Sequence, residues 1–220
     1  MPKKAVSAQS IVESALFSAF KNGMGETSLA DIAQDLGIKK ASLYNYFAGK
    51  EEILAALCSY CSDFYAKVNL FEQEIFTKIN SGNSEKLFKK AVDAYIRAHE
   101  AEPLFQIYTL VASEKYFDKN FFDIYESQRQ KVFEQSFLFF KIASAQTQGS
   151  AQQSDEDLSR HSDFFTDGIL SRLDLYIAQK KETIRRNPEC DAGSLFALPS
   201  DEKQITKITA FAVDILRTLI

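Results

Sequence analysis

The fold is decided by residues 27–54, which read TSLADIAQDLGIKKASLYNYFAGKEEIL. Within this stretch, residues 29–47 carry the small Ala33 at the fifth position and Gly37 at the ninth. A small residue lets two short helices cross closely, and glycine permits a tight turn between them. The apolar residues that would hold both helices on a neighbouring helix are Ile32, Leu36, Ile38 and Leu43. The spacing predicts a helix-turn-helix whose second helix projects from the surface.

Helix signals flank this unit on both sides. Ser7 can cap a first helix, and Ser28 with Asp31 can cap the helix that follows. The first helix has apolar residues at helical intervals: Val12, Ala15, Leu16, Ala19 and Phe20. A third, short helix is predicted over residues 40–47, and a longer connecting helix over residues 50–68.

Helical periodicity also dominates the rest of the chain. Only 8 Gly and 4 Pro occur in 220 residues, so a strand-rich fold with frequent turns is not expected. The Gln- and Ser-rich residues 145–157 are predicted to be a mobile loop. Further helices are predicted near 84–99, 103–116, 120–144, 158–187 and 200–219. The fold class is therefore all-α, with about nine helices.

Charge is distributed unevenly along the chain. The net charge is −4, but residues 1–50 hold six lysines against four carboxylates, which is +2 and leaves −6 for residues 51–220. Affinity for DNA depends on cations close to the phosphates more than on total charge. A positively charged segment over residues 1–50, followed by a negatively charged remainder, is therefore compatible with DNA binding.

Composition also bears on localisation and on metals. No run of 18 apolar residues and no signal-peptide pattern is found, so we expect a cytoplasmic protein with no membrane partner. Cys58 and Cys61 form a CxxC within a predicted helix. Only Cys190, His99 and His161 remain as soft ligands, so two small buried residues are favoured over a metal or redox site. We expect no metal and no cofactor.

From Thr27 to Leu54 the sequence resembles the DNA-binding head of the TetR family. The resemblance covers residues 7–57 and is carried by the helix cap, the turn glycine, the Leu-Tyr-x-x-Phe of residues 43–47 and the Lys-Glu-Glu of residues 50–52. It implies a three-helix helix-turn-helix DNA-binding domain over residues 1–50, which the connecting helix 50–68 joins to the rest. Residues 51–220 would then be a C-terminal helical bundle for dimerisation and ligand binding.

The resemblance also implies which residues bind double-stranded DNA. Residues 39–42 would face the major groove, Tyr44 and Tyr46 would donate hydrogen bonds to phosphate oxygens, and helix starts would approach other phosphates. At the positions of Ala41 and Asn45, members of the TetR family commonly carry other residues. The predicted set is Thr27, Ser28, Lys39, Lys40, Ala41, Ser42, Tyr44, Asn45, Tyr46 and Lys50. The alternative is a merely solvated helix face, for which two tyrosines beside two lysines are unusual.

Aromatic residues are dense between positions 103 and 144. A pocket lined by them would suit a small apolar or aromatic effector, whereas plain core packing is the alternative for each of them. The predicted effector-binding residues are His99, Phe105, Tyr108, Tyr125, Arg129, Phe133 and Phe137.

The last two predicted helices carry apolar stripes that one subunit would struggle to cover. Pairing two copies would bury the stripes and would place two reading heads on successive turns of a palindromic operator. The predicted homodimer interface comprises Phe164, Ile169, Leu173, Tyr176, Ile208, Ala212 and Ile215.

Three function classes can be compared at this point. A ligand-responsive repressor is the leading interpretation, in which an effector shifts a two-state dimer away from its operator. A DNA-bound adaptor that contacts another protein without a small molecule is the alternative. An enzyme is disfavoured, because the sequence has no nucleophile paired with a base, no metal-spaced carboxylates and no phosphate loop.

Overall fold

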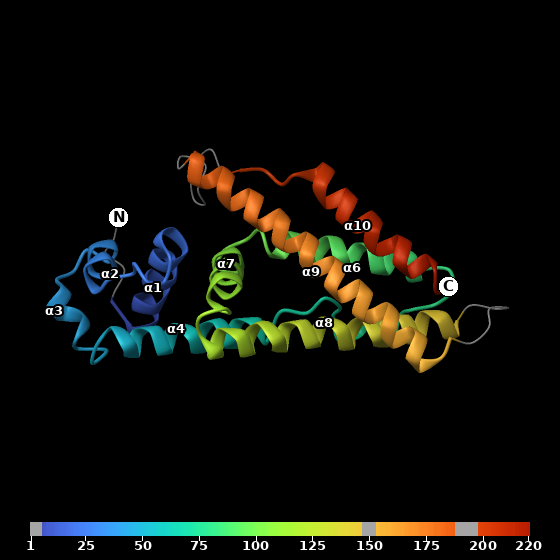
Figure 1. Cartoon of the computed structure of the whole chain (residues 1–220), viewed down its shortest axis with the longest axis horizontal. Coiled ribbons are helices and arrows are strands. Elements are labelled where there is room, and N and C mark those ends of the chain that lie inside the picture. Colours follow the sequence, from blue (N-terminus) through green and yellow to red (C-terminus); the bar gives the residue numbers. More distant parts are fainter. Residues whose placement is uncertain (1–5, 147–152, 188–197) are drawn as a thin grey trace. The chain divides into compact units, whose positions relative to one another are not determined.

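The computed structural model describes residues 6–146, 153–187 and 198–220, which form ten α-helices and no strand (Figure 1). The helices are α1 (Ala8–Asn22), α2 (Leu29–Asp35), α3 (Lys40–Leu43), α4 (Lys50–Tyr65), α5 (Gln73–Phe76), α6 (Ser84–Ala98), α7 (Leu104–Glu114), α8 (Lys119–Ala145), α9 (Asp155–Arg186) and α10 (Glu202–Arg217). The predicted all-α class is confirmed. Over the described ranges, no helix combines the length and the apolar character needed to span a lipid bilayer.

Three details of the helices differ from the sequence-based expectations. The additional helix α5 is too short for its periodicity to be recognised. Helix α3 ends at Leu43, before the predicted residue 47. Helix α9 begins at Asp155, three residues earlier than predicted, because Ser154 caps it and three acidic residues in its first turn favour a helix N-terminus. Part of the predicted loop is thus helical, and its residues 147–152 lie outside the described ranges.

The first compact unit combines Met1–Lys67 with Pro103–Glu126. Helix α1 contacts α2, α4 and α7, and it contributes the buried side chains of Ile11 and Leu16. Phe20 of α1 meets Phe105 of α7 edge to face, with 5.3 Å between ring centroids. Helix α1 therefore joins the two segments of the unit, because it packs on helices from both.

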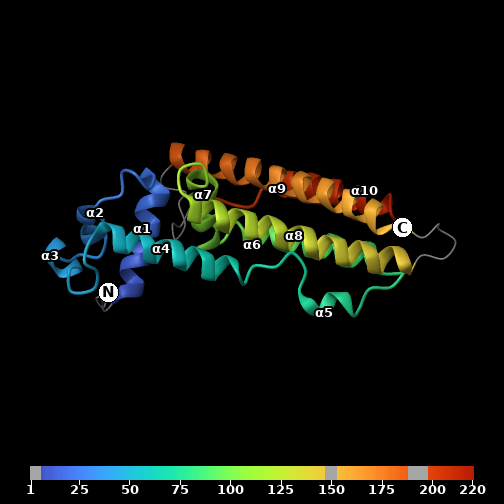
Figure 2. The ribbon, with the colours of Figure 1, turned by 60° about the horizontal axis from the view of Figure 1, so that its bottom comes forward.

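The second compact unit combines Val68–Glu102 with Ser127–Ile220. Its core is a cluster of phenylalanine rings in which Phe88 of α6 lies 5.0 Å from Phe139 of α8 and 5.3 Å from Phe165 of α9. Phe71 stacks on Phe139 at 4.7 Å. Helix α10 packs on α6 and α9, and Figure 2 shows α10 alongside α9.

The compact units do not coincide with the predicted division at residue 50. Helices α4 and α7 both belong to the first unit, since α7 packs on α1 and α4. A functional division between a head over residues 1–50 and a body over residues 51–220 stays a prediction.

Candidate nucleic-acid interface

The turn between α2 and α3 is built from local backbone interactions. Ser28 accepts a hydrogen bond from the Asp31 backbone, and the Asp31 carboxylate accepts one from the Ser28 backbone, which closes a capping box at the start of α2. Gly37 adopts φ 65°, a left-handed conformation that side chains disfavour. The Ile38 N–H then donates to the Ala33 carbonyl at 2.9 Å. The chain therefore reverses tightly, as the glycine predicts.

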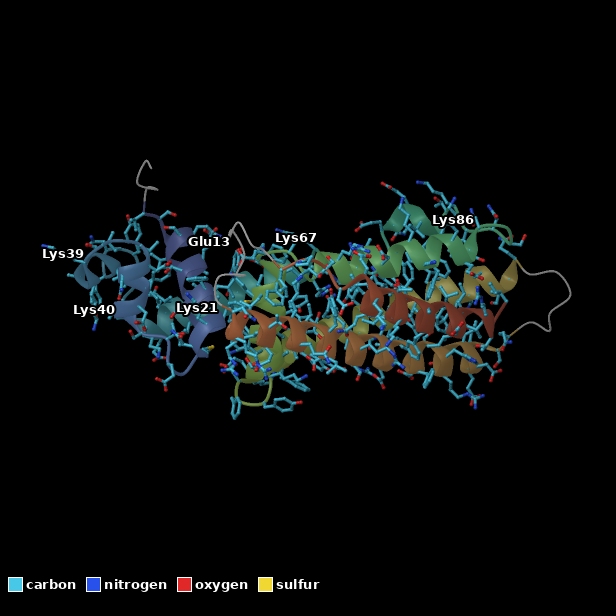
Figure 3. The ribbon with its side chains drawn as sticks, turned by 90° about the horizontal axis from the view of Figure 1, so that it is seen from above. Glu13, Lys21, Lys39, Lys40, Lys67 and Lys86 are labelled. Carbon is cyan, nitrogen blue, oxygen red and sulfur yellow. The ribbon has the colours of Figure 1, made fainter. Side chains whose placement is uncertain are left out.

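Helix α3 presents polar side chains to solvent while one residue holds it to the core. Leu43 is 1% exposed and is the buried anchor. The exposed residues of this region are Lys39, Lys40, Ala41, Tyr44, Asn45 and Tyr46. Lys39 and Lys40 point away from the ribbon (Figure 3). Six of the ten predicted DNA-binding residues therefore lie together on one accessible surface, and Ser42 is half-buried beside them.

The segment after α3 is a turn. The Tyr46 N–H and the Phe47 N–H both donate to the Leu43 carbonyl, at 3.0 and 3.1 Å. Such a tightened end satisfies a terminal carbonyl without continuing the helix. Tyr44, Asn45 and Tyr46 thus extend from a turn, and their directions do not follow the helical spacing expected for residues 40–47.

Three hydroxyl groups predicted to reach phosphates already have partners within the protein. Thr27 is fully buried and donates to the Gly23 carbonyl at 3.0 Å, so the expected phosphate contact of its side chain is wrong for this structure. Ser28 donates to the Asp31 carboxylate at 2.6 Å. Tyr46 donates to the Val6 carbonyl at 3.0 Å. Each hydroxyl has one proton to donate. Because that proton is donated within the protein, the three hydroxyls stabilise the local structure.

Lys50, at the start of α4, is half-buried in the same unit. Its Nζ donates to the Gly25 carbonyl at 3.4 Å, which ties α4 to the loop before α2. An ammonium has three N–H donors, so one long hydrogen bond to a carbonyl leaves Lys50 able to take a further acceptor. The position is compatible with the predicted phosphate contact.

The predicted effector-binding residues are distributed over both compact units. The first unit contains Phe105, Tyr108 and Tyr125. Phe105 is buried there, and the Lys115 ammonium lies 3.9 Å from the Tyr125 ring centroid. His99, Arg129, Phe133 and Phe137 belong to the second unit. The assignment of Phe105 to an effector pocket needs correction, since Phe20 covers its ring.

Within the second unit the predicted effector-binding residues have separate surroundings. Arg129 pairs with Asp167 at 2.9 Å and with Asp163 at 3.7 Å. His99 is fully buried, and its Nδ1 donates to the Tyr95 carbonyl at 2.7 Å. Burial lowers the pKa of His99 to about 4, so its ring is neutral at physiological pH. Phe133 and Phe137 are half-buried and stack on each other at 6.3 Å.

The predicted dimer interface requires a larger correction. Ile169, Leu173, Tyr176, Ile208, Ala212 and Ile215 are all buried within the chain, because α10 lies against α6 and α9 and covers the apolar stripes. Only Phe164 of the predicted set is exposed, at 62%.

Sequence reasoning missed two other apolar residues on the same helices, one exposed and one half-buried. Leu175 of α9 is 58% exposed, and Phe211 of α10 lies 6.1 Å from Phe164. The Phe211 ring passes directly over Gly168, where an added Cβ would overlap a ring carbon. The signal in the sequence was this mid-helix glycine, which marks a close approach.

The two cysteines of the CxxC differ in exposure. Cys61 is fully buried, as predicted, and burial raises the pKa of its thiol to about 12. Cys58 is half-buried, and burial followed by the nearby Asp118 charge raises its pKa as well. Both thiols are therefore held in the protonated, unreactive form.

Comparison with known proteins agrees with this geometry. Residues 11–57 match the family of bacterial regulatory proteins called the tetR family. No curated protein matches the chain.

Solved structures extend the similarity over the full length. A TetR-like transcriptional regulator from Rhodococcus sp. RHA1 has a TM-score of 0.59 at 14% identity, over 99% of this chain and 96% of that one. SmeT, the repressor of the Stenotrophomonas maltophilia multidrug efflux pump SmeDEF, has a TM-score of 0.55 at 12% identity, over 97% and 90%. A TetR transcription regulator from Haloarcula marismortui has a TM-score of 0.56 at 11% identity, over 96% and 97%. At these identities the likeness establishes a shared fold.

Proposed function

We propose that the chain is a DNA-binding regulator of the TetR family, whose model matches residues 11–57, and that it is a homodimeric repressor of a palindromic operator. A small apolar or aromatic effector would release it from the operator. The observation that carries the proposal is the exposed surface of α3 and the following turn, defined here as the reading surface: Lys39, Lys40, Ala41, Ser42, Tyr44, Asn45 and Tyr46.

The residues of the reading surface would make different contacts with DNA. The exposed ammonium groups of Lys39 and Lys40, at the start of α3, can contact phosphates or guanine edges in the major groove. Tyr44 is 53% exposed and offers a hydroxyl donor to phosphate oxygens. Leu43 fixes the orientation of these groups, because its side chain is packed in the core.

Dimerisation would use the surface of Phe164, Leu175 and Phe211 in place of the buried stripes predicted from sequence. The guanidinium of Arg172 lies 3.4 Å from the centroid of the Phe211 ring, so a cation–π contact orders this surface in the single chain. Aromatic residues with an arginine beside them are typical of interface cores. Pairing two copies there would bury this surface of α9 and α10 between the subunits. The two-fold symmetry of the dimer would then match that of a palindromic operator.

Effector control is the third part of the proposal. The second unit is rich in phenylalanine, which favours an apolar or aromatic ligand. SmeT, which has the same fold, is a repressor. By analogy, this supports repression over activation for the present chain. An effector would act by binding more tightly to the conformation in which the two heads no longer match the operator spacing.

A titration of fluorescent duplex DNA tests the DNA-binding part. Lys39→Ala combined with Lys40→Ala should weaken binding and reduce its salt dependence, whereas Lys89→Ala combined with Lys90→Ala, two exposed lysines of α6, should change neither. Circular dichroism must show equal helicity in all three proteins. Equal weakening by both pairs would mean that only total charge matters and would refute the assignment of the reading surface.

The alternative function is a DNA-bound adaptor that contacts another protein and needs no effector. It is favoured by one specific observation: Tyr116 and Phe117, between α7 and α8, are 78% and 86% exposed. Adjacent exposed aromatic residues are typical of sites that contact proteins. Tyr116→Ser with Phe117→Ser should leave DNA affinity unchanged under both hypotheses but should abolish regulation in cells only if the adaptor is correct.

A further inference from the structure

The turn that follows α3 is tied to two other parts of the head. The Tyr46 hydroxyl donates to the Val6 carbonyl at 3.0 Å, across 40 positions of sequence. The Ala48 N–H donates to the carboxylate of Glu52, which lies in the first turn of α4. The Tyr46 bond therefore links this turn to the N-terminal end of α1, and the Ala48 bond links it to α4.

The carbonyl that accepts the Tyr46 proton belongs to an ordered helix start. Val6 is half-buried and directly precedes Ser7, the N-cap of α1. The Ser7 side chain accepts a hydrogen bond from the Ser10 backbone at 3.1 Å, and the Ser7 backbone donates to the Ser10 hydroxyl at 2.9 Å. Such a capping box fixes the chain as it enters a helix, and the next residue, Ile11, is fully buried. The Tyr46 bond thus ends on a fixed point of the head.

The two tyrosines of the reading surface differ in what their hydroxyls bind. Tyr44 is 53% exposed and Tyr46 is 43% exposed. The Tyr44 hydroxyl has no hydrogen-bond partner among the described residues, so its proton is available to a DNA phosphate. A phenol has one proton, and while Tyr46 donates it to Val6 it cannot donate to a phosphate. Asn45 lies between them in the sequence and is exposed, and its amide has the donor and acceptor that suit an adenine edge.

We propose that Tyr46 is a positioning residue for base recognition: its bond to Val6 fixes the turn that carries Asn45, and its hydroxyl does not bind DNA. The inference rests on the proposed function, since it assumes that the reading surface faces DNA. A hydrogen bond to a base edge requires its donor within about 0.5 Å of the productive position. The attraction of an ammonium group to phosphates tolerates larger displacements, because Coulomb energy changes slowly with distance. Loosening the turn therefore lowers affinity for the preferred sequence and leaves affinity for DNA in general unchanged.

Hydrogen exchange of the full chain without DNA tests the anchor by itself. The Tyr46 and Phe47 N–H groups donate to the Leu43 carbonyl at 3.0 and 3.1 Å, so their exchange reports opening of the turn. Tyr46→Phe removes only the hydroxyl and should speed exchange of both groups about fivefold, the equivalent of one ordinary hydrogen bond. Tyr44→Phe is the matched control and should leave both rates unchanged. Unchanged rates in Tyr46→Phe would show that the bond does not hold the turn and would overturn the inference.

Binding to two duplexes of equal length then tests the role in recognition: the duplex that the wild type enriches from a random pool, and a mixed-sequence duplex. Tyr46→Phe should weaken binding of the enriched duplex about fivefold per bound head and leave binding of the mixed-sequence duplex unchanged. Tyr44→Phe, which removes a phosphate contact, should weaken both by the same factor. Equal weakening of both duplexes by Tyr46→Phe would make Tyr46 a phosphate contact, and no weakening of either would make it irrelevant to binding; each result overturns the inference.

A double-mutant cycle with Asn45 completes the test. In the Asn45→Ala background, Tyr46→Phe should have no further effect on the ratio of the two affinities, and a retained full effect would contradict positioning of Asn45. Equal thermal midpoints show that the variants are equally stable. If the Lys39→Ala, Lys40→Ala protein binds as well as wild type, or the wild type enriches no duplex, the proposed function fails and this inference with it, whatever the exchange rates show.

Discussion

Acidification tests whether His99 is a core residue or a group that faces an open effector pocket. Its pKa in the folded protein is about 4, because the ring is buried, whereas the unfolded chain has the ordinary value of 6.5. Between pH 6.5 and pH 4 the unfolded state therefore binds a proton that the folded state does not, so the free energy of unfolding falls as the pH falls. Each pKa unit corresponds to about 1.36 kcal/mol, so this difference amounts to about 3 kcal/mol.

The assay is urea unfolding at fixed protein concentration from pH 7 to pH 4, on the wild type and on His99→Gln. Carboxylates contribute equally to both proteins and cancel in the comparison. The wild type should lose about 3 kcal/mol more than the variant across this range. Parallel stability profiles would mean that His99 titrates normally, as a group in a water-filled pocket would, and would refute its assignment to the core.

Three further predictions concern the packing that supports the two interfaces. Glu100→Gln should cost about 3 kcal/mol in urea unfolding, because Lys180 is 11% exposed and loses its charged partner at 2.7 Å; an unchanged midpoint would show the pair to be dispensable. Leu43→Ala should destabilise the head by about 3 kcal/mol and abolish DNA binding, and retained binding would contradict its role as the anchor of α3. Phe164→Asp should convert dimers to monomers in sedimentation experiments, whereas Leu138→Asp, on a 40% exposed position of α8, should not; dimers in both would exclude the proposed surface.

The sequence predicted the head well because its signals are local. Ser28 and Asp31 form the expected capping box, and Gly37 has the positive φ that the turn requires. Leu43 is buried as its position in the pattern indicates. Each of these features depends on residues fewer than ten positions apart, so helix caps and spacing are enough to recognise it.

The body was predicted less well because its contacts join distant segments. The apolar stripe of Ile208 and Ala212 on α10 looks like a partner surface until α10 is placed against α6, where ion pairs join Arg97 to Glu202 at 2.8 Å and Arg217 to Glu85 at 2.6 Å. Periodicity shows that a helix has an apolar face but not which element covers it. The same limit applies to Phe105, whose ring is covered by α1.

The hydrogen-bond partners of hydroxyl groups were also predicted incorrectly from the sequence. A Thr or Tyr at a helix start or on an exposed turn can bind a phosphate or the protein's own backbone, and the sequence does not distinguish these partners. Thr27 bonds to Gly23 and Tyr46 bonds to Val6.

The central claim, that the reading surface of a dimer recognises a palindromic operator, is tested most directly by selecting bound duplexes from a random DNA pool at near-physiological salt, where non-specific phosphate binding is weak. The account predicts enrichment of an inverted repeat by the wild type and its loss in the Lys39→Ala, Lys40→Ala protein. Enrichment of the same repeat by both proteins, or no enrichment by the wild type after it has been unfolded and refolded to remove bound small molecules, would contradict the account.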